Sequence, residues 1–306
     1  MTVLRIGTRG SALALWQARA LAVALEPSGM RTELVTISTR GDRTQDVPLA
    51  AMGGKGVFVK EIHDALLDGD IDVAVHSAKD MAAMPPDGVT IAAVLPREDP
   101  RDALVLTIVP GAKASGSAVL SPGAVIGTGS PRRIAQLRRI FPGARFEPIR
   151  GNVDTRLRKL DAGDVTALVL ACAGLRRLGL AERISVPLAT TDCVPAPGQG
   201  TIAVEARADD CAIIELLATL SDPASRIALA AEQALVAELG GGCQLPLGAF
   251  AEIHGAELSI RAVAASIGGT AFLESGITGS PNNPVEAGKR LARELASRGA
   301  RELLNT

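Results

Sequence analysis

At 306 residues the chain is too long for one small domain, and a formal net charge of −1 gives it no overall field that would attract DNA or an anionic membrane. Hydrophobic residues make up 47% of the chain but aromatic residues only 2%, which makes it poorly suited to stacking nucleic-acid bases. The first residues show no apolar signal core, and no apolar run approaches the ~20 residues of a membrane span, so we expect a soluble, cytoplasmic protein.

The chain opens with a strand, a glycine-rich turn and a helix. The strand covers residues 3–6, the turn is GTRGS at 7–11, and the helix runs over 12–25. Ser11 fits the N-cap position, where a side-chain oxygen accepts a hydrogen bond from a backbone N–H. Such a turn leaves backbone N–H groups and the positive helix end facing outward, so it predicts an anion-binding site. The helix should bury an apolar face made of Leu13, Trp16, Ala20 and Val23.

A glycine-rich loop and a carboxylate come next. The stretch MGGKGVFVKE at 52–61 carries Lys55 and Phe58 and has the composition of a lid beside a cleft. Asp80 ends the segment HSAKD, directly after the buried strand DVAV. A carboxylate held there among cations can stabilise a developing positive charge, although an N-cap role or a salt bridge to Lys79 explains it as well.

The strand-to-helix turn recurs in the middle of the chain. GTGS at 127–130 follows a strand over 124–126 and precedes a helix with Pro131 at its first position, and Ser130 is the expected N-cap. Neither turn has the spacing GxGxxG or GxxxxGK[ST]. The sequence therefore carries no dinucleotide or P-loop fingerprint at these turns.

Two longer segments also resemble each other, LLDGDIDVAVHSAKD at 66–80 and KLDAGDVTALVLACAG at 159–174. Each runs from a helix end through an acidic-glycine turn into a buried strand, which predicts two α/β domains of similar build. The proline-rich stretches at 96–104 and 192–200 are the expected crossings between them. After about residue 217 a helix, alternating strands and a last helix predict a small α+β domain.

Basic residues are concentrated in one region: nine lie between positions 132 and 159, against two acidic ones. Arg132 and Arg133 stand in the first turn of a helix, where they oppose its dipole, and the sequence suggests no other partner for them. We expect them to hold a bound anion in a cleft, together with Arg9, Arg150 and Arg156. A guanidinium fork suits carboxylate as well as phosphate, so these residues leave the anion open.

The four cysteines and three histidines lack metal-ligand spacing, so we expect no metal site. Cys172 should be a buried core thiol, Cys211 should be structural, and Cys193 lies on a loop and stays ambiguous. The fourth, Cys243, follows the glycine triplet 240–242. That triplet is either a helix C-cap with a flexible turn or a tethering point against which a bulky group lies.

Nine segments in order resemble the hydroxymethylbilane synthase family, also called porphobilinogen deaminase: RIGTRGSALALWQA, GGKGVFVKE, VHSAKDM, PREDPRDA, GTGSPRR, RGNVDTRLRKLDAG, AGLRRLGL, PAPGQG and GGGCQLPLG. They cover nearly the whole chain. The resemblance implies a cytoplasmic transferase of tetrapyrrole (porphyrin and heme) biosynthesis. Such an enzyme condenses four porphobilinogen molecules stepwise, losing ammonia each time, and then releases the linear tetrapyrrole hydroxymethylbilane by hydrolysis.

The resemblance also implies a fold and its domain limits. The fold is α/β, with two similar periplasmic-binding-protein-like domains and a small α+β C-terminal domain. The implied limits are 1–96 with 199–216 for the first domain, 101–194 for the second and 217–306 for the third.

The resemblance assigns roles to individual residues as well. It implies a dipyrromethane cofactor bound through a thioether to Cys243, and catalysis by Asp80. Gln199 and Gly200 match the binding loop that returns the chain to the first domain, and the loop at 52–61 matches the lid. The remaining residues that would bind cofactor and substrate carboxylates are Arg9, Ser11, Ser77, Lys79, Thr128, Ser130, Arg132, Arg133, Arg150, Arg156 and Arg177.

Two positions depart from the family pattern. Met81-Ala82 stands where the family usually has Val-Pro, which puts the loop geometry behind Asp80 in question, and Gly129 stands where it usually has a second serine. The duplicated domains also permit a two-domain anion-binding protein of the solute-receptor type, without catalysis. We expect a monomer whose partner is porphobilinogen rather than nucleic acid or a membrane.

Overall fold

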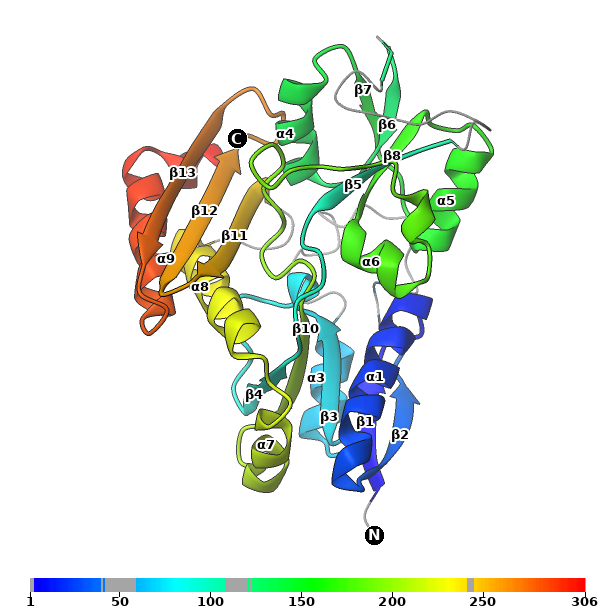
Figure 1. Cartoon of the computed structure of the whole chain (residues 1–306), viewed down its shortest axis with the longest axis vertical. Coiled ribbons are helices and arrows are strands. Elements are labelled where there is room, and N and C mark those ends of the chain that lie inside the picture. The colour runs from blue at the N-terminus through cyan, green and yellow to red at the C-terminus, as the bar shows by residue number, and fades with distance from the viewer. Residues whose placement is uncertain are drawn as a thin grey trace.

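The computed structural model describes residues 3–39, 41, 59–107, 120–121, 123–240 and 245–305. These residues form two five-stranded sheets and one three-stranded sheet, each covered by helices (Figure 1). We call the parts built on these sheets the first, second and third domains. The predicted fold class, two α/β domains with a smaller C-terminal one, is confirmed. Within the described ranges, no helix is long and apolar enough to cross a bilayer.

The first sheet has the strand order β2-β1-β3-β10-β4. Strand β1 runs parallel to β2 and β3, whereas β10 runs antiparallel to β3 and β4, with Ile202 opposite Ser77. Helices α1 and α7 pack on one face of the sheet and α3 packs on the other. The bounds are β1 Val3–Thr8, α1 Ala12–Leu25, β2 Arg31–Thr36, α3 Lys60–Leu67, β3 Val73–Ser77, β4 Val89–Val94, β10 Ile202–Arg207 and α7 Cys211–Ala218, with short 3₁₀ turns η1 at Glu26–Ser28 and η3 at Ala78–Asp80.

The second sheet repeats this arrangement in the order β7-β6-β8-β5-β9. Strand β6 is parallel to β7 and β8, and β5 is antiparallel to β8 and β9. The repeated segments at 66–80 and 159–174 therefore supply the equivalent central strands β3 and β8, as predicted. The bounds are β5 Asp102–Leu106, β6 Val125–Gly127, α4 Pro131–Ile140, β7 Arg145–Glu147, α5 Val153–Asp161, β8 Ala167–Ala171, α6 Cys172–Arg177, η5 Ala181–Arg183 and β9 Val186–Pro187.

The chain crosses twice between these domains. Strand β4 of the first domain is followed in the chain by β5 of the second domain, and β9 of the second domain is followed by β10 of the first. Each crossing therefore leads into the antiparallel strand that lies beside the central strand of the sheet it enters. Two connections rather than one therefore join the domains that face the cleft described below.

Helix α1 has the predicted bounds, but its predicted apolar face is wrong. The buried side chains are Ala14, Gln17, Ala18, Leu21 and Leu25. Trp16 is 38% exposed and Val23 is 61% exposed. These residues follow helical spacing and form the face of α1 that packs on the sheet. The small side chains of Ala14 and Ala18 let the helix approach the sheet closely. Trp16 lies on the side nearer the second domain, where Arg177 stacks over its ring at 5.6 Å.

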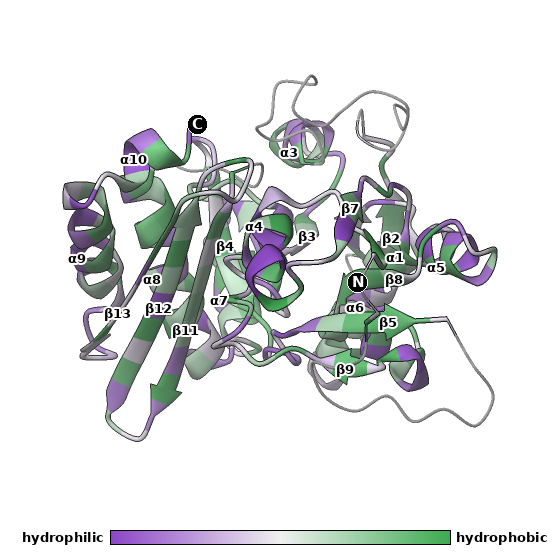
Figure 2. Cartoon of the chain, turned by 90° about the horizontal axis from the view of Figure 1, so that it is seen from above, coloured by the Kyte–Doolittle hydropathy of each residue, from purple (hydrophilic) through white to green (hydrophobic). Residues whose placement is uncertain are grey.

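The third domain is an antiparallel meander packed against helices. Side chains of β11 alternate: Leu247, Ala249 and Ala251 face the helices, and Phe250 faces Val194 of the second domain. Seen from above, α9 and α5 turn hydrophilic residues outward, and the strands beside them are largely hydrophobic (Figure 2). The bounds are α8 Pro223–Leu239, β11 Leu247–His254, β12 Glu257–Ala265, β13 Phe272–Gly279, α9 Pro284–Ser297 and α10 Ala300–Leu303.

A buried carboxylate anchors the third domain to the crossings. Glu232 on α8 is fully buried and accepts hydrogen bonds from Arg97 Nη1 at 2.7 Å and from the backbone N–H groups of Gly198 at 2.6 Å and Ala251 at 2.7 Å. Arg97 Nε also donates to the carbonyl of Gln199 at 2.8 Å. One side chain thus joins α8, β11 and both crossing segments.

Candidate functional site

A cavity of about 330 Å³ lies between the first and second domains. It is lined from the first domain by the β1–α1 turn and by η3, and from the second domain by residues around the start of α5 and by α6. Seven of the predicted site residues line it together: Arg9, Ser11, Lys79, Asp80, Arg133, Arg150 and Arg156. Side chains from distant parts of the sequence therefore converge on one cleft.

The charge of this cleft is strongly positive. Five of its lining residues are arginine or lysine, and the acidic ones are Asp80 and Asp154. Burial lowers the pKa of Lys79 to about 8, against the attraction of Asp80. Burial and the nearby charge of Arg133 lower the pKa of Arg156 to about 10. Cations held this close together favour an anionic ligand, because an anion relieves both the burial cost and their repulsion.

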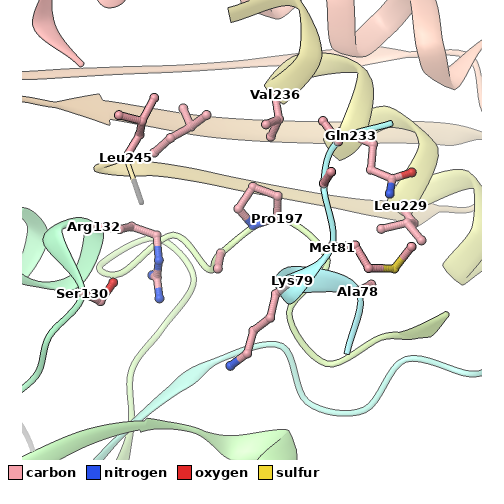
Figure 3. A pocket seen from close by; sticks show the side chains of 14 residues that line it. Ala78, Lys79, Met81, Ser130, Arg132, Pro197, Leu229, Gln233, Val236 and Leu245 are labelled. Atoms are coloured by element: carbon pink, nitrogen blue, oxygen red, sulfur yellow. The ribbon is translucent and has the colours of Figure 1, made fainter. Parts of the chain in front are cut away.

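A smaller cavity of about 80 Å³ adjoins the cleft at Lys79, which lines both (Figure 3). Leu229, Val236 and Leu245 from the third domain form its apolar side, and Ser130 and Arg132 lie across from them with Lys79 (Figure 3). The cavity thus places an apolar surface opposite hydroxyl and cationic groups, a combination that suits a flat ring bearing carboxylates.

The predicted attachment point lies next to this smaller cavity in the sequence. Gly240 is the C-cap of α8, with a left-handed φ of 71°, so the first glycine of the triplet ends the helix. Cys243 itself lies outside the described residues, as do the predicted lid residues Lys55 and Phe58. Leu245 is the first described residue after Cys243 and lines the cavity.

Both glycine-rich turns have the predicted caps. The Ser11 side chain accepts a hydrogen bond from Ala14 N at 3.3 Å, and Ser130 accepts one from Arg133 N at 3.5 Å. Thr128 is fully buried and its Oγ1 accepts from Ser130 N at 3.3 Å, which fixes the second turn. Each turn therefore presents the start of a helix toward the space between the domains.

The structure supplies a partner for Arg132 and Arg133 that the sequence alone does not suggest. Asp102, fully buried on β5, lies 2.8 Å from Arg132 Nη1 and 2.7 Å from Arg133 Nη2. The expectation that these arginines have no other partner is therefore wrong. They are 4% and 6% exposed, yet Arg132 still lines the smaller cavity and Arg133 the cleft. The two guanidinium groups share one carboxylate, so this cluster keeps an excess positive charge.

Other predicted residues lie at the crossings instead of in either of these cavities. Arg177 Nη2 donates to the carbonyl of Gly200 at 2.7 Å, and Gln199 Nε2 donates to Pro100 O at 2.7 Å and to Asp102 Oδ1 at 3.0 Å. These contacts position the crossings. Ser77 accepts from Gln17 Nε2 at 3.3 Å and lines a third cavity, of about 50 Å³, beside Asp80.

The three described cysteines have different surroundings. Cys172 is fully buried, as predicted, and burial raises its pKa to about 12. Cys193 is also fully buried, with burial and the charge of Asp102 raising its pKa to about 12, which makes it a structural thiol. Cys211 begins α7 and is exposed.

The departure at Met81 leaves the segment behind Asp80 well packed. Met81 is 6% exposed and packs with Val94, Ala203 and Leu229 of α8. An apolar side chain therefore still joins the end of η3 to the third domain. Asp80 is the last residue of η3, so it does not serve as the N-cap of that turn.

Two groups of interacting residues could not be predicted from the sequence. The first is the ion pair of Asp102 with Arg133, which are 31 positions apart. The only sequence feature that points to it is the presence of an acidic residue in the proline-rich crossing. His63, His76 and Glu205 come together between α3 and the first sheet although their spacing in the sequence predicts nothing.

Comparison with known proteins gives consistent matches over the whole chain. The family model "Porphobilinogen deaminase, dipyromethane cofactor binding domain" matches residues 4–215, and "Porphobilinogen deaminase, C-terminal domain" matches residues 226–297. The porphobilinogen deaminase of Syntrophomonas wolfei is 47% identical over 306 residues, covering 99% of this chain and 98% of that protein. The porphobilinogen deaminase of Chromobacterium violaceum is 44% identical, covering 98% of this chain and 96% of that protein.

Among solved structures, the periplasmic VFT2 domain of Bordetella pertussis BvgS matches with a TM-score of 0.41 at 17% identity, covering 71% of this chain and 86% of that chain. The two matching family models and the relatives at full-length coverage place the sequence without ambiguity. The chain belongs to the porphobilinogen deaminase family.

Proposed function

We propose that this chain carries out its family's hydroxymethylbilane synthase reaction in the cleft between the first two domains, with Asp80 as the catalytic carboxylate. The family activity is a transferase reaction that condenses porphobilinogen on a dipyrromethane cofactor. The observation that carries the assignment of the site is the convergence of five cationic side chains and Asp80 on one cavity. The rival reading, an anion-binding receptor without catalysis, is not supported by the family match.

The cations of the cleft suit the carboxylates of this substrate. Each pyrrole of porphobilinogen carries an acetate and a propionate group, and guanidinium forks bind carboxylates through paired hydrogen bonds. Arg9, Arg150 and Arg156 surround the cavity, and Ser11 lies beside them at a helix start. We assign to these residues the holding of substrate and chain carboxylates while successive units are joined.

We propose that the smaller cavity receives one ring of the cofactor. Its apolar side accepts the face of a pyrrole ring, and Lys79, Ser130 and Arg132 across from it accept carboxylates. We propose that the cofactor is joined by a thioether to Cys243, which stands two positions before Leu245 at the cavity wall. When bound, it supplies the free pyrrole position to which the first substrate unit is joined.

Asp80 lies where a carboxylate can act on the reacting rings. It lines both the cleft and the third cavity, next to Arg9 and Ser11 in each. Loss of ammonia from porphobilinogen leaves positive charge on the pyrrole nitrogen, and joining the new unit frees a ring proton. A fixed carboxylate within hydrogen-bond reach stabilises the cation and helps to move that proton. Because Lys79 and arginines flank Asp80, the substrate carboxylates are held on either side of it.

We further propose that the active unit is a cytoplasmic monomer with the domain limits 1–96 with 199–216, 101–194 and 217–306. Residues of a single chain line both cavities, and Glu232 joins the third domain to the crossings within that chain. The position of β10 in the first sheet supports the return of the chain after residue 199. Sedimentation of the cofactor-loaded protein at several concentrations measures the oligomeric state.

The experiment that tests Asp80 is single-turnover release of ammonia, read together with mass spectra of the loaded chain. Asp80→Asn keeps the size of the side chain but removes its charge, so elongation should slow by about 10² to 10³ while substrate still binds. Asp80→Glu keeps the charge and should retain partial activity. Asp154→Asn is the matched control, because Asp154 lines the same cavity and is exposed on α5. Elongation by Asp80→Asn within a few-fold of wild type would overturn the assignment.

A further inference from the structure

Three potential ligands meet in the first domain outside the proposed catalytic site. His63 on α3, His76 on β3 and Glu205 on β10 place one ligand atom each within 4.8 Å of the others. His63 Nε2 lies 2.7 Å from Glu205 Oε2, and His76 Nε2 lies 3.1 Å from the same oxygen. The two imidazole rings meet edge to face, with centroids 5.9 Å apart. The group lies between α3 and the sheet, and the proposed reaction makes no use of it.

The hydrogen bonds of this group are incomplete. His76 Nε2, although 3.1 Å from Glu205 Oε2, makes no hydrogen bond with it, and Glu205 Oε1 also has no hydrogen-bond partner among the residues that the structure describes. The side chain of His76 is 3% exposed and that of Glu205 is 0% exposed. Buried polar atoms in folded proteins nearly always have a partner, so two unpartnered ones in a single cluster indicate a missing ligand. Both are atoms that coordinate metals.

The types of donor atom also suit coordination. A carboxylate with two imidazoles is a common donor set for zinc. The donors come from three separate elements, so a bound ion would link α3 to the two strands.

We propose that His63, His76 and Glu205 form a site for one divalent first-row transition-metal ion of the Zn²⁺ class. Imidazole nitrogen and carboxylate oxygen are ligands that Zn²⁺ accepts, and three protein ligands leave a fourth position for water. This differs from the absence of a metal site expected from sequence spacing.

Binding an ion requires the ligand atoms, which lie within 4.8 Å of one another, to adjust their separations. Zinc ligands lie about 2.0–2.2 Å from the ion, which places two tetrahedral ligands about 3.3 Å apart. The separation of His63 Nε2 from Glu205 Oε2 must therefore open from 2.7 Å by roughly half an ångström. His63 has room to retreat, because its side chain on α3 is 13% exposed whereas its two partners are enclosed.

Metal titration of the cofactor-loaded, chelator-treated full chain tests this site. Calorimetry with Zn²⁺ should show one ion per chain, and Co²⁺ should give the visible bands of a four- or five-coordinate ion. A ligand set without sulfur should give no thiolate charge-transfer band, which separates this site from binding at the exposed Cys211. His63→Gln keeps a donor toward Glu205 but removes the ligating ring, and should weaken Zn²⁺ binding by about tenfold or more.

The matched control is His254→Gln. His254 Nε2 lies 3.0 Å from Glu252 Oε1 on the surface of the third domain, so it offers a histidine–carboxylate pair without a second histidine. This variant should bind Zn²⁺ as wild type does. His76→Gln provides a second test should His63→Gln fold poorly. If wild type binds no stoichiometric ion, or if both ligand variants bind it as tightly as wild type, the three side chains form only a hydrogen-bonded cluster.

Discussion

Arg133 donates two hydrogen bonds to a single oxygen of Asp102, from Nε at 3.0 Å and from Nη2 at 2.7 Å. The second oxygen of Asp102 lies 2.8 Å from Arg132 Nη1. The arginines come from the first turn of α4 and the carboxylate from β5. Both guanidinium groups are therefore held in place before a ligand arrives, and one of their two charges is left to attract it.

The first prediction concerns this buried cluster. Asp102→Asn leaves two buried guanidinium groups without a carboxylate, and breaking a buried ion pair from one side costs about 3–5 kcal/mol of unfolding free energy. Asp64→Asn is the control, because Asp64 pairs at 3.0 Å with Lys60 and both side chains are exposed. Ion pairs between two exposed side chains contribute about 1 kcal/mol or less. Denaturant unfolding of both variants measures the difference, and equal losses would show that Asp102 is not the anchor described here.

Lowering the pH should remove the stability that the same cluster contributes. Burial alone would raise the pKa of Asp102, but Arg132 and Arg133 hold it well below its usual range. A carboxyl group with a depressed pKa stabilises the fold above its unfolded pKa and loses that contribution as the pH falls toward the folded value. Wild type should therefore lose stability relative to Asp102→Asn only below about pH 4. A difference that already shrinks near neutral pH would point to another group.

Deprotonation of Lys79 should lower the activity of the enzyme at alkaline pH. Burial lowers its pKa to about 8, and only the protonated amine attracts a carboxylate. The value of kcat/KM reports groups of the free enzyme, so it should fall as the pH rises through about 8. Lys79→Arg stays charged and should remove this decline, while Lys60→Arg, an exposed change on α3, should keep it. An unchanged decline in Lys79→Arg would assign it to another residue.

Gly200 should be intolerant of any side chain. Its φ of 87° is left-handed, and a Cβ there would collide with the carbonyl oxygen of Glu98 in the other crossing. Gly179 has a φ of 71° with nothing near its Cβ position, so Gly179→Ala isolates the backbone strain, about 1–2 kcal/mol. Gly200→Ala should lose clearly more stability, because the crossings must also separate. Equal melting temperatures for the two variants would contradict this contact.

The local elements of the fold can be read from the sequence, because their causes lie within a few residues. Ser11 and Ser130 cap the helices that follow them, and Pro131 begins α4, as the turn chemistry predicts. The buried face of α1 was predicted wrongly. Trp16 has an apolar side chain, but it lies on the exposed side of the helix beside Arg177. Periodicity alone does not reveal which of two apolar stripes meets the sheet.

The site could be predicted less completely, because its geometry depends on contacts between distant segments. The cations of the cleft were predicted from their helix starts and from the family resemblance, and the cavity brings seven predicted residues together. The role of Asp102 and the meeting of His63 with Glu205, 142 residues apart, follow only from the way the strands are ordered. No spacing rule in one sequence records such contacts.

The central claim is that this chain builds its product on a cofactor joined to Cys243. The mass of the intact, denatured protein tests it most directly. Wild type made in cells should exceed the sequence mass by two linked pyrrole units, and brief exposure to porphobilinogen should add further pyrrole units stepwise. Cys211→Ser, which removes the exposed described thiol, should show the same masses, and Cys243→Ser should show the bare chain. An active wild-type protein with the unmodified sequence mass, or an adduct that persists in Cys243→Ser, would contradict the account.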